Sequence, residues 1–306
     1  MAVTPWDSDA LWAKAKLFIS RAMDGKVNQS FDIQALWAAV ALESLGKAAL
    51  ASHSPLLVAA PNEEGTNLLA ATGLVGEATK FTSISAKTMH IRCGRAFRTY
   101  NRDKAKAITD WRNDYLHGVA VLPAIPESVW WADFWSQAEV LIHASGHTVD
   151  EFVGPNRSAE VQGHLAANAR MLENRLASLV DAAKRYKSLS DQGQLTGSPA
   201  RRWREFQLDG NFKYWEVTEC PACKGGGVIF GDEVISHEMQ NIYFGPDDDV
   251  VEIGVSVQVA AELFECEYCH LRLDDYDLLV EADLSGDFEA EGDIEDFIVE
   301  EEYGND

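Results

Sequence analysis

The sequence lacks the features that mark secreted and membrane-spanning proteins. Its first nine residues, Met-Ala-Val-Thr-Pro-Trp-Asp-Ser-Asp, have neither the basic start nor the apolar core of a secretion signal. No apolar run approaches the roughly 20 residues that a helix needs to cross a bilayer. We therefore expect a cytoplasmic protein with no membrane partner.

The chain is not short of the side chains that build a core. Apolar residues make up 46% of its 306 residues and aromatic residues 10%, with nine Trp. Disordered and fibrous chains have other compositions, so both classes are excluded. The length is sufficient for two domains.

Basic residues are scarce in the last third of the chain. Residues 201–306 hold six Lys and Arg against 29 Asp and Glu, and they account for the whole formal net charge of −23. Residues 80–117 show the opposite balance, with nine Lys and Arg against three Asp. A local positive excess is expected where a polyanion binds, but a solvated helix face gives the same pattern. Charge alone leaves both interpretations open.

Residues 1–150 are predicted to form an all-α bundle. Apolar residues recur there at three- and four-residue steps. Either Asp7 or Ser8 is a suitable cap for the first helix, and Ser30 is a suitable cap for the second. Gly73 and Gly76 are expected to interrupt the third helix. The helices that we expect cover 7–24, 31–51, part of 66–95, 101–117 and 127–145.

The rest of the chain is predicted to be a long helix followed by a small β-rich domain. Leu and Ala at helical spacing predict an amphipathic helix over 157–190, after a break at Gly154-Pro155-Asn156. Gly, Gln, Thr, Ser and Pro predict a linker over 191–202. Alternating β-branched segments predict strands within 203–285, and the Asp- and Glu-rich residues 286–306 predict an acidic tail. The expected fold class is therefore α+β.

Two C-x-x-C units in the last third predict a metal site. Cys220 and Cys223 form one unit, and Cys266 and Cys269 form the other. Two thiolates three positions apart on a tight turn reach one ion, and a second turn completes a tetrahedron. We expect one structural Zn²⁺ per chain, in a zinc ribbon with an enlarged hairpin between its knuckles. Reduced cysteines or a redox pair are the alternative.

The predicted metal site is not expected to be catalytic, because four thiolates leave no open position for water. Its acidic surroundings disfavour direct phosphate binding. We expect this region to contact a protein activator or inhibitor, or the basic region of the same or another subunit. The acidic residues either cover that basic region as a nucleic-acid mimic or only keep the protein soluble. The fifth cysteine, Cys93, is expected to be a packed thiol.

A short string at the end of the fourth predicted helix carries candidate chemistry. Arg112, Asn113 and His117 form R-N-x-x-x-H, with Asn113 and His117 about 40° apart on one helix face. An imidazole whose pKa lies near neutrality moves protons, and a guanidinium grips a phosphate bidentately. Together they supply what metal-free RNA cleavage by the ribose 2′-OH requires. A His that caps helix-end carbonyls beside an Arg in a surface salt bridge is the alternative.

Residues 1–150 resemble a HEPN domain, a helical bundle found in prokaryotic toxins, anti-phage defence proteins and the RNases of some CRISPR effectors. That family is marked by an R-x4-6-H motif near the end of a late helix, often with Asn, Asp or His after the Arg, as in Arg112, Asn113 and His117. Residues 41–50 are similar to the family's second helix, where an acidic residue and a Lys commonly occur. Glu43 and Lys47 stand there, and they either belong to the site or form an ordinary surface ion pair.

The resemblance implies a metal-independent endoribonuclease that serves as a toxin or an anti-phage defence effector. It implies a homodimer or larger assembly, in which two Arg and two His face one cleft, and products with a cyclic phosphate and a free 5′-hydroxyl. The candidate catalytic residues are Arg112, Asn113, His117 and Glu43. The candidate RNA-binding residues are Lys47, Arg92, Arg95, Arg98, Arg102, Lys104 and Lys106.

Two other functions fit the same sequence. One is a non-catalytic bundle that dimerises and binds RNA or a protein, although the presence of the motif argues for catalysis. The other is a zinc-ribbon regulator of transcription, against which the acidity around the ribbon argues.

Overall fold

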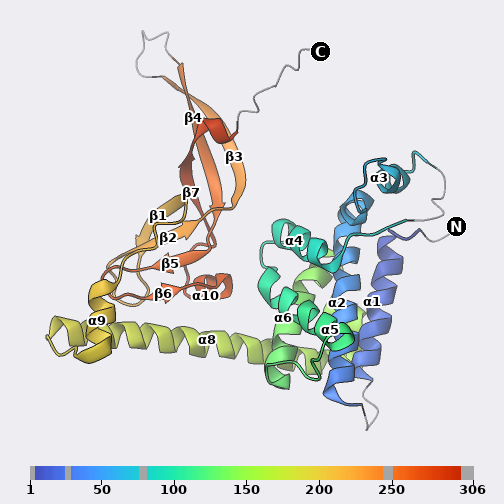
Figure 1. The fold of residues 1–306 in the computed structure, drawn as a ribbon, viewed down its shortest axis with the longest axis horizontal. Helices are drawn as coiled ribbons and strands as arrows, with labels where there is room; N and C mark the ends of the chain where they lie inside the picture. Colours follow the sequence, from blue (N-terminus) through green and yellow to red (C-terminus); the bar gives the residue numbers. More distant parts are fainter. Residues whose placement is uncertain (1–3, 25–28, 76–80, 244–250, 298–306) are drawn as a thin grey trace. The chain divides into compact units, whose positions relative to one another are not determined.

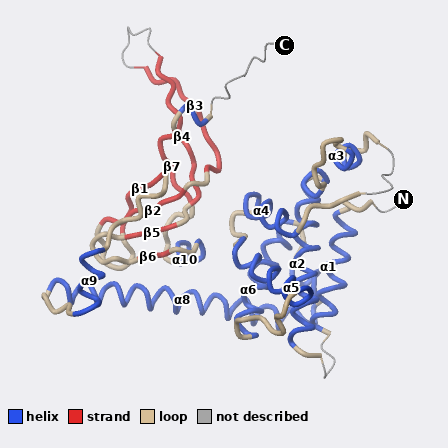
Figure 2. Tube along the Cα trace, viewed as in Figure 1, coloured by secondary structure: helices blue, strands red, loops and turns tan. Residues whose placement is uncertain are grey.

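The protein divides into a helical unit and a unit rich in strands. The computed structural model describes residues 4–24, 29–75, 81–243 and 251–297. The two compact units are Met1–Arg170 and Met171–Asp306. Helices form the first unit, and antiparallel sheets dominate the second (Figure 1; Figure 2). The predicted α+β class is confirmed.

The first unit is a bundle built around one alanine-rich helix, α2, which packs against α1, α4, α5 and α6. Small side chains along α2 allow these helices to approach closely. A Cβ at Gly46 of α2 would lie 2.2 Å from Met89 Sδ of α4, so any larger residue here would displace the buried Met89 side chain. The described elements are α1 (Ser8–Met23), α2 (Phe31–His53), η1 (Pro55–Val58), α3 (Thr66–Ala71), α4 (Ala86–Ala96), α5 (Arg102–His117), α6 (Glu127–Ala144), α7 (Val149–Val153) and the start of α8 (Pro155–Asp191).

Helix α2 is an exception to the expectation that no apolar segment approaches membrane-spanning length. Within the described part of the chain, it is the one helix long and apolar enough to cross a bilayer. However, 61% of its most apolar window is buried inside the protein. Such burial is typical of the central helix of a bundle.

The third predicted helix is two separate helices, α3 and α4. Gly73 adopts a φ of +73° just after α3, a conformation that ends helices and favours glycine. Ser85 then caps α4, because its side chain accepts a hydrogen bond from the N–H of Thr88. The second predicted interruption, Gly76, lies outside the described residues.

The long helix α8 starts at Pro155, two residues earlier than predicted. Gly154, with a φ of +83°, ends α7, and proline is well suited to the first turn of the next helix. The boundary between the two units falls within α8. Val161 of α8 belongs to the core of the first unit, and Ala183 belongs to the core of the second.

The predicted linker over 191–202 is wrong in its second half, because α9 (Gly197–Glu205) begins inside it. Gly197 and Pro199 at the start of α9 are typical of a linker. The helix is stabilised by aromatic contacts of Trp203, near its C-terminal end, and of Phe206, which follows it. Trp203 and Phe206 both stack on the ring of His270, at centroid distances of 3.8 and 4.1 Å. Residues 203–285 therefore do not form a domain that starts at 203.

Two antiparallel sheets form the rest of the second unit. One has the strand order β1-β2-β5-β6, and the other has the order β3-β4-β7. The paired strands β3 and β4 lie between the two C-x-x-C units in the sequence, as the enlarged hairpin predicted. The strands are β1 (Tyr214–Glu219), β2 (Gly226–Gly231), β3 (Val234–Tyr243), β4 (Val251–Ala260), β5 (Leu263–Glu265), β6 (Arg272–Leu273) and β7 (Asp287–Gly292), with α10 (Tyr276–Glu281) before β7 and η2 (Ile294–Asp296) after it.

The predicted acidic tail over 286–306 is wrong for its first part. Strand β7 pairs with β4 in antiparallel register, with Phe288 opposite Val259 and Ala290 opposite Val257. Phe288 is 2% exposed, whereas its acidic neighbour Glu289 is exposed. The alternation of apolar and acidic residues is that of a half-buried strand. The prediction of a tail rested on the high content of Asp and Glu and did not take this alternation into account. Residues 298–306 lie outside the described part of the tail.

Candidate metal centre and candidate catalytic site

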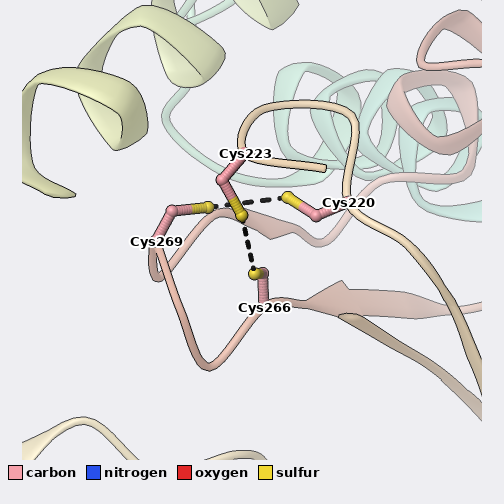
Figure 3. A group of neighbouring side chains, drawn as sticks. All are labelled: Cys220, Cys223, Cys266 and Cys269. Atoms are coloured by element: carbon pink, nitrogen blue, oxygen red, sulfur yellow. Dashed lines mark hydrogen bonds between the residues drawn. The ribbon is translucent and has the colours of Figure 1, made fainter. Parts of the chain in front are cut away.

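Four cysteine side chains meet where two hairpin turns approach each other. Cys220 and Cys223 lie between β1 and β2, and Cys266 and Cys269 lie between β5 and β6. Their Sγ atoms lie within 4.8 Å of one another and point toward a common centre (Figure 3). The closest pairs are 3.5 Å (Cys220–Cys269) and 3.6 Å (Cys223–Cys266), whereas a disulfide requires about 2.05 Å. The predicted grouping of these cysteines is confirmed.

The spacing of the sulfur atoms fits a metal ion. Sulfurs about 2.3 Å from a tetrahedral ion lie roughly 3.8 Å from each other, close to the two shortest distances in this cluster. The two turns also share one backbone geometry. The N–H of Lys224 donates to the carbonyl of Cys220, and the N–H of His270 donates in the same way to Cys266. Lys224 and His270 adopt positive φ angles of 61° and 54°, which turn the chain back behind each second cysteine.

Hydrogen bonds within the cluster favour a thiolate at Cys220. The contact with the Cys269 side chain lowers the pKa of Cys220 to about 5, against the effect of burial and with help from the N–H groups of Cys223 and Ala222. The same contact raises the pKa of Cys269. Since metals bind thiolates, a bound cation would release the remaining protons. These four residues could therefore hold a metal ion.

A second cluster of charged side chains joins α2 to α5 in the first unit. Arg112 Nη1 lies 3.1 Å from Glu43 Oε2, and Lys47 Nζ lies 2.8 Å from Glu43 Oε1. Lys47 also donates to Ser83 Oγ at 3.2 Å. The side chains of Arg112 and Lys47 are only 15% and 13% exposed. The predicted pair of Glu43 and Lys47 is confirmed. Arg112 joins the two residues in a cluster of three charged side chains.

This cluster keeps a positive charge at neutral pH. Burial raises the pKa of Glu43, but the hydrogen bond and charge of Lys47, followed by those of Arg112, outweigh it and lower the pKa. Glu43 is therefore ionised and neutralises one of the two cations beside it. A cluster of two cations and one carboxylate attracts a phosphate.

His117 lies on the surface, apart from Arg112. It is the last residue of α5 and is exposed, as is Asn113 one turn earlier. Arg112 faces α2 instead, and within the described residues no hydrogen bond or ion pair joins it to His117. The structure thus brings Arg112, Glu43 and Lys47 together and leaves Asn113 and His117 facing solvent.

His90 was missed by sequence reasoning, because no motif surrounds it. The ring of this 2% exposed residue lies between two hydroxyl groups, with Nδ1 2.7 Å from Tyr100 Oη and Nε2 2.7 Å from Thr109 Oγ1. Burial lowers the pKa of His90 to about 4; the charge of Glu43 raises it and that of Arg112 lowers it. A neutral imidazole thus ties α4 to α5 close to the Arg112 cluster. Its only sequence signal is its place on the apolar face of α4 with Met89 and Cys93.

Three of the candidate RNA-binding residues have contacts inside the bundle. Lys47 belongs to the Glu43 cluster. Arg92 is half-buried, and its Nη1 donates to the carbonyl of Leu57 at 2.6 Å. Lys104, with its side chain 18% exposed, lies 4.0 Å from Asp133. These side chains stabilise the packing of the helices, so they are less available to RNA than their charge suggests.

The other four candidate RNA-binding residues are exposed. Arg95 and Arg98 lie at and just beyond the end of α4, and Arg102 lies at the start of α5. Lys106 forms an ion pair with Asp110 one turn away, at 2.5 Å. Arg102 likewise lies 3.9 Å from Asp103, so exposure alone does not decide between an RNA-binding surface and a solvated helix face.

An exposed apolar segment surrounds His117 in the sequence. Val119 is 92% exposed and Val121 is 69% exposed, and Leu116, Leu122 and Ile125 range from 41% to 57%. Consecutive exposed apolar side chains are typical of a surface that contacts another protein.

Comparison with known proteins gives no relative for this fold or these sites. No protein-family model, curated protein or solved structure matches the chain. The HEPN resemblance rests on the residues of the chain alone.

Proposed function

We propose that this protein is a metal-independent endoribonuclease of the HEPN type, which acts as a cytoplasmic toxin or anti-phage defence effector. Arg112 and His117 are the proposed catalytic residues, with Asn113 beside His117 and Glu43 positioning Arg112. The observation that carries the proposal is the cationic cluster in which Glu43 and Lys47 hold the Arg of the motif.

A site composed of two copies of the chain accounts for the separation of Arg112 and His117. Among the described residues of one chain, no hydrogen bond or ion pair joins them, so we infer that one copy alone does not assemble the site. The exposed apolar residues of 116–125 supply a surface for a second copy beside His117. In the proposed homodimer, His117 from each copy and the Arg112 clusters face one RNA strand.

The proposed reaction is an attack of a ribose on its own phosphate. His117 of one copy accepts the proton of the 2′-OH, and that oxygen forms a bond with the adjacent phosphorus. Arg112 stabilises the charge that develops on the phosphoryl oxygens. The bond from phosphorus to the 5′-oxygen then breaks, and His117 of the second copy protonates the leaving oxygen. The products are a 2′,3′-cyclic phosphate and a 5′-hydroxyl.

For the second unit, we propose that Cys220, Cys223, Cys266 and Cys269 hold one structural Zn²⁺. Tetrahedral thiolate sites select zinc among the common divalent cations. Four protein ligands leave no coordination position open for water. The ion would hold the two knuckle turns together. The acidic strands around it are the proposed contact surface for a protein activator or inhibitor.

The test is RNA cleavage in the presence of EDTA. Purified protein is incubated with total RNA, beside the variants Arg112→Ala, His117→Ala and His143→Ala. We expect cleavage by the parent and a loss of at least about 100-fold for the first two variants, since each removes a group that acts in the transition state. His143 is an exposed histidine in the last turn of α6 and serves as the matched control, with unchanged activity expected.

The second candidate function is a non-catalytic module that binds RNA or a protein. The engagement of Arg112 by Glu43 favours it, because a guanidinium in a partly buried ion pair also has a purely structural use. RNA binding without cleavage by any form of the protein, in the presence and absence of cell extract, would support this module and contradict the nuclease.

A further inference from the structure

A cavity of about 360 Å³ lies in the second unit. It is bordered by the end of α8, by α9 and by the second knuckle turn, which is the β5–β6 turn that carries Cys266 and Cys269. Four aromatic rings line it, and each is partly exposed: Tyr186 of α8, Trp203 of α9, Phe206 and His270. Leu179 and Ala183 form part of its apolar lining. Cavities of this size accept a small ligand or one unit of a polymer.

The knuckle turn itself fixes the arrangement of the rings. The left-handed backbone of His270 places its imidazole against Trp203 and Phe206, with interplanar angles of 29° and 11°. Figure 1 shows α9 beside the end of α8, near the β5–β6 edge. The cavity is therefore built by elements of one unit, and the cysteine cluster supports one of its walls.

Charge along this unit is strongly segregated. Residues 184–204 hold six Lys and Arg and a single Asp, whereas residues 205–306 hold three Lys and Arg and 29 Asp and Glu. Most of the basic side chains of the unit therefore lie on the two helices that border the cavity. The expectation that the ribbon region repels phosphate, which rested on its total charge, does not apply to this face.

Two arginines line the cavity, and they differ in their partners. Arg272 is an ion-pair partner of the buried Glu265, at 2.6 Å. Arg202 is exposed and has no ion pair within the described residues. Its neighbour Arg201 pairs with Glu205 at 3.5 Å and does not line the cavity. Arg202 is thus the lining cation that is free to bind an anion.

We propose that this cavity binds a nucleotide unit of single-stranded RNA. The base stacks on the exposed parts of the aromatic rings, and the phosphate pairs with Arg202. Partly exposed aromatic rings beside an unpaired arginine are the usual means by which proteins bind single strands. An acidic peptide would satisfy Arg202 but would leave the rings without a planar partner. The site is separate from Arg112 and His117 and does not rest on the proposed nuclease activity.

Photo-crosslinking tests the proposal on the full chain. The probe is a 2′-O-methyl RNA of about 12 nucleotides with one 4-thiouridine, which the proposed nuclease cannot cleave because its 2′-oxygen is blocked. After irradiation, the crosslinked peptides are mapped by mass spectrometry. We expect crosslinks within 201–208 or 267–272. Arg202→Glu should lower their yield about tenfold near 0.1 M salt, and Arg201→Glu less than about twofold.

Crosslinks confined to residues 1–170, or equal losses for the two variants, would overturn the proposal. Competition distinguishes the ligands. Removal of the crosslink by unlabelled RNA alone supports a strand, and removal by AMP as well supports a free nucleotide with the same chemistry. Removal by poly-glutamate as effectively as by RNA would overturn the proposal in favour of an acidic peptide.

Discussion

Several charged and polar side chains of the first unit have specific partners. Glu43 lies between Lys47 and Arg112, and Tyr115 on α5 donates to Asp32 near the start of α2 at 2.8 Å. Such pairs stabilise a fold only while both members are present, because a lone buried charge is costly. His90 is the uncharged case, with a hydroxyl group on each ring nitrogen.

His90 should make the stability of the protein depend on pH. Its pKa is lowered to about 4 in the folded state, so the unfolded state binds more protons between about pH 6.5 and pH 4. The free energy of unfolding should therefore fall by about 3 kcal/mol as the pH decreases through this interval. Urea denaturation of the parent and of His90→Gln measures the effect.

His90→Gln should be less stable than the parent at neutral pH. Its free energy of unfolding should change much less between pH 6.5 and pH 4, so the slope of stability against pH should be smaller. The exposed His143→Gln is the control and should keep the slope of the parent. Parallel pH profiles for His90→Gln and the parent would show that His90 is not the group responsible.

Single residues differ in how far the sequence predicts their role. The spacing of Cys220, Cys223, Cys266 and Cys269 is a local pattern with one common geometry, so the cluster was predictable. Glu43 and Lys47 are four residues apart on one helix and were predictable for the same reason. The pairing of Arg112 with Glu43 joins residues 69 positions apart. Only the packing of α5 on α2 determines it.

Where α2 meets α4, the side chain of Met89 occupies the space beside Gly46. Gly46 allows Met89 to lie against the backbone of α2. Gly46→Ala should destabilise the protein by about 1–3 kcal/mol, since the added Cβ overpacks the core. Chemical denaturation with circular dichroism detection measures the change.

Gly163 in α8 provides the matched comparison. It is exposed, and a Cβ there would meet no atom within 4 Å. Gly163→Ala should stabilise the protein by about 0.5–1 kcal/mol through helix propensity. Equal effects of the two substitutions would contradict the assigned close approach of α2 and α4.

Elements were predictable where their local signals agreed with their packing. Of the two residues expected to cap α1, Asp7 does so, through a hydrogen bond from Ala10 N–H at 2.9 Å, and Ser8 is the first residue of the helix. Strand β7 and helix α9 were not predicted, because the contacts that stabilise them are made with residues distant in the sequence. Phe288 of β7 lies opposite Val259 of β4, and Trp203 of α9 stacks on the ring of His270.

The two units, which have separate apolar cores, share helix α8. The first has an extensive apolar core, whereas the second groups a smaller core around the cysteine cluster. Because Cys220, Cys266 and Cys269 belong to that smaller core, a metal bound there would contribute directly to folding. None of the four cysteines belongs to the core of the first unit.

Removal of metal should therefore unfold the second unit and spare the first. The purified protein should contain a single Zn²⁺ per chain by elemental analysis, and Cys269→Ser should lose it, whereas Cys93→Ala should retain it. In calorimetry, a strong chelator should abolish one unfolding transition and leave the helical transition in place. An unchanged melting profile after complete metal removal would contradict the structural role.

The chemistry of the new RNA ends distinguishes attack by the 2′-OH from metal-dependent hydrolysis. A labelled single-stranded RNA is incubated with the protein in EDTA, and both ends at the cut are identified by mass spectrometry. Attack by the 2′-OH predicts a 2′,3′-cyclic phosphate and a 5′-hydroxyl from the parent, and no product from His117→Ala. Ends with a 3′-hydroxyl and a 5′-phosphate, or cleavage only after addition of Mg²⁺, would contradict the assigned roles of Arg112 and His117.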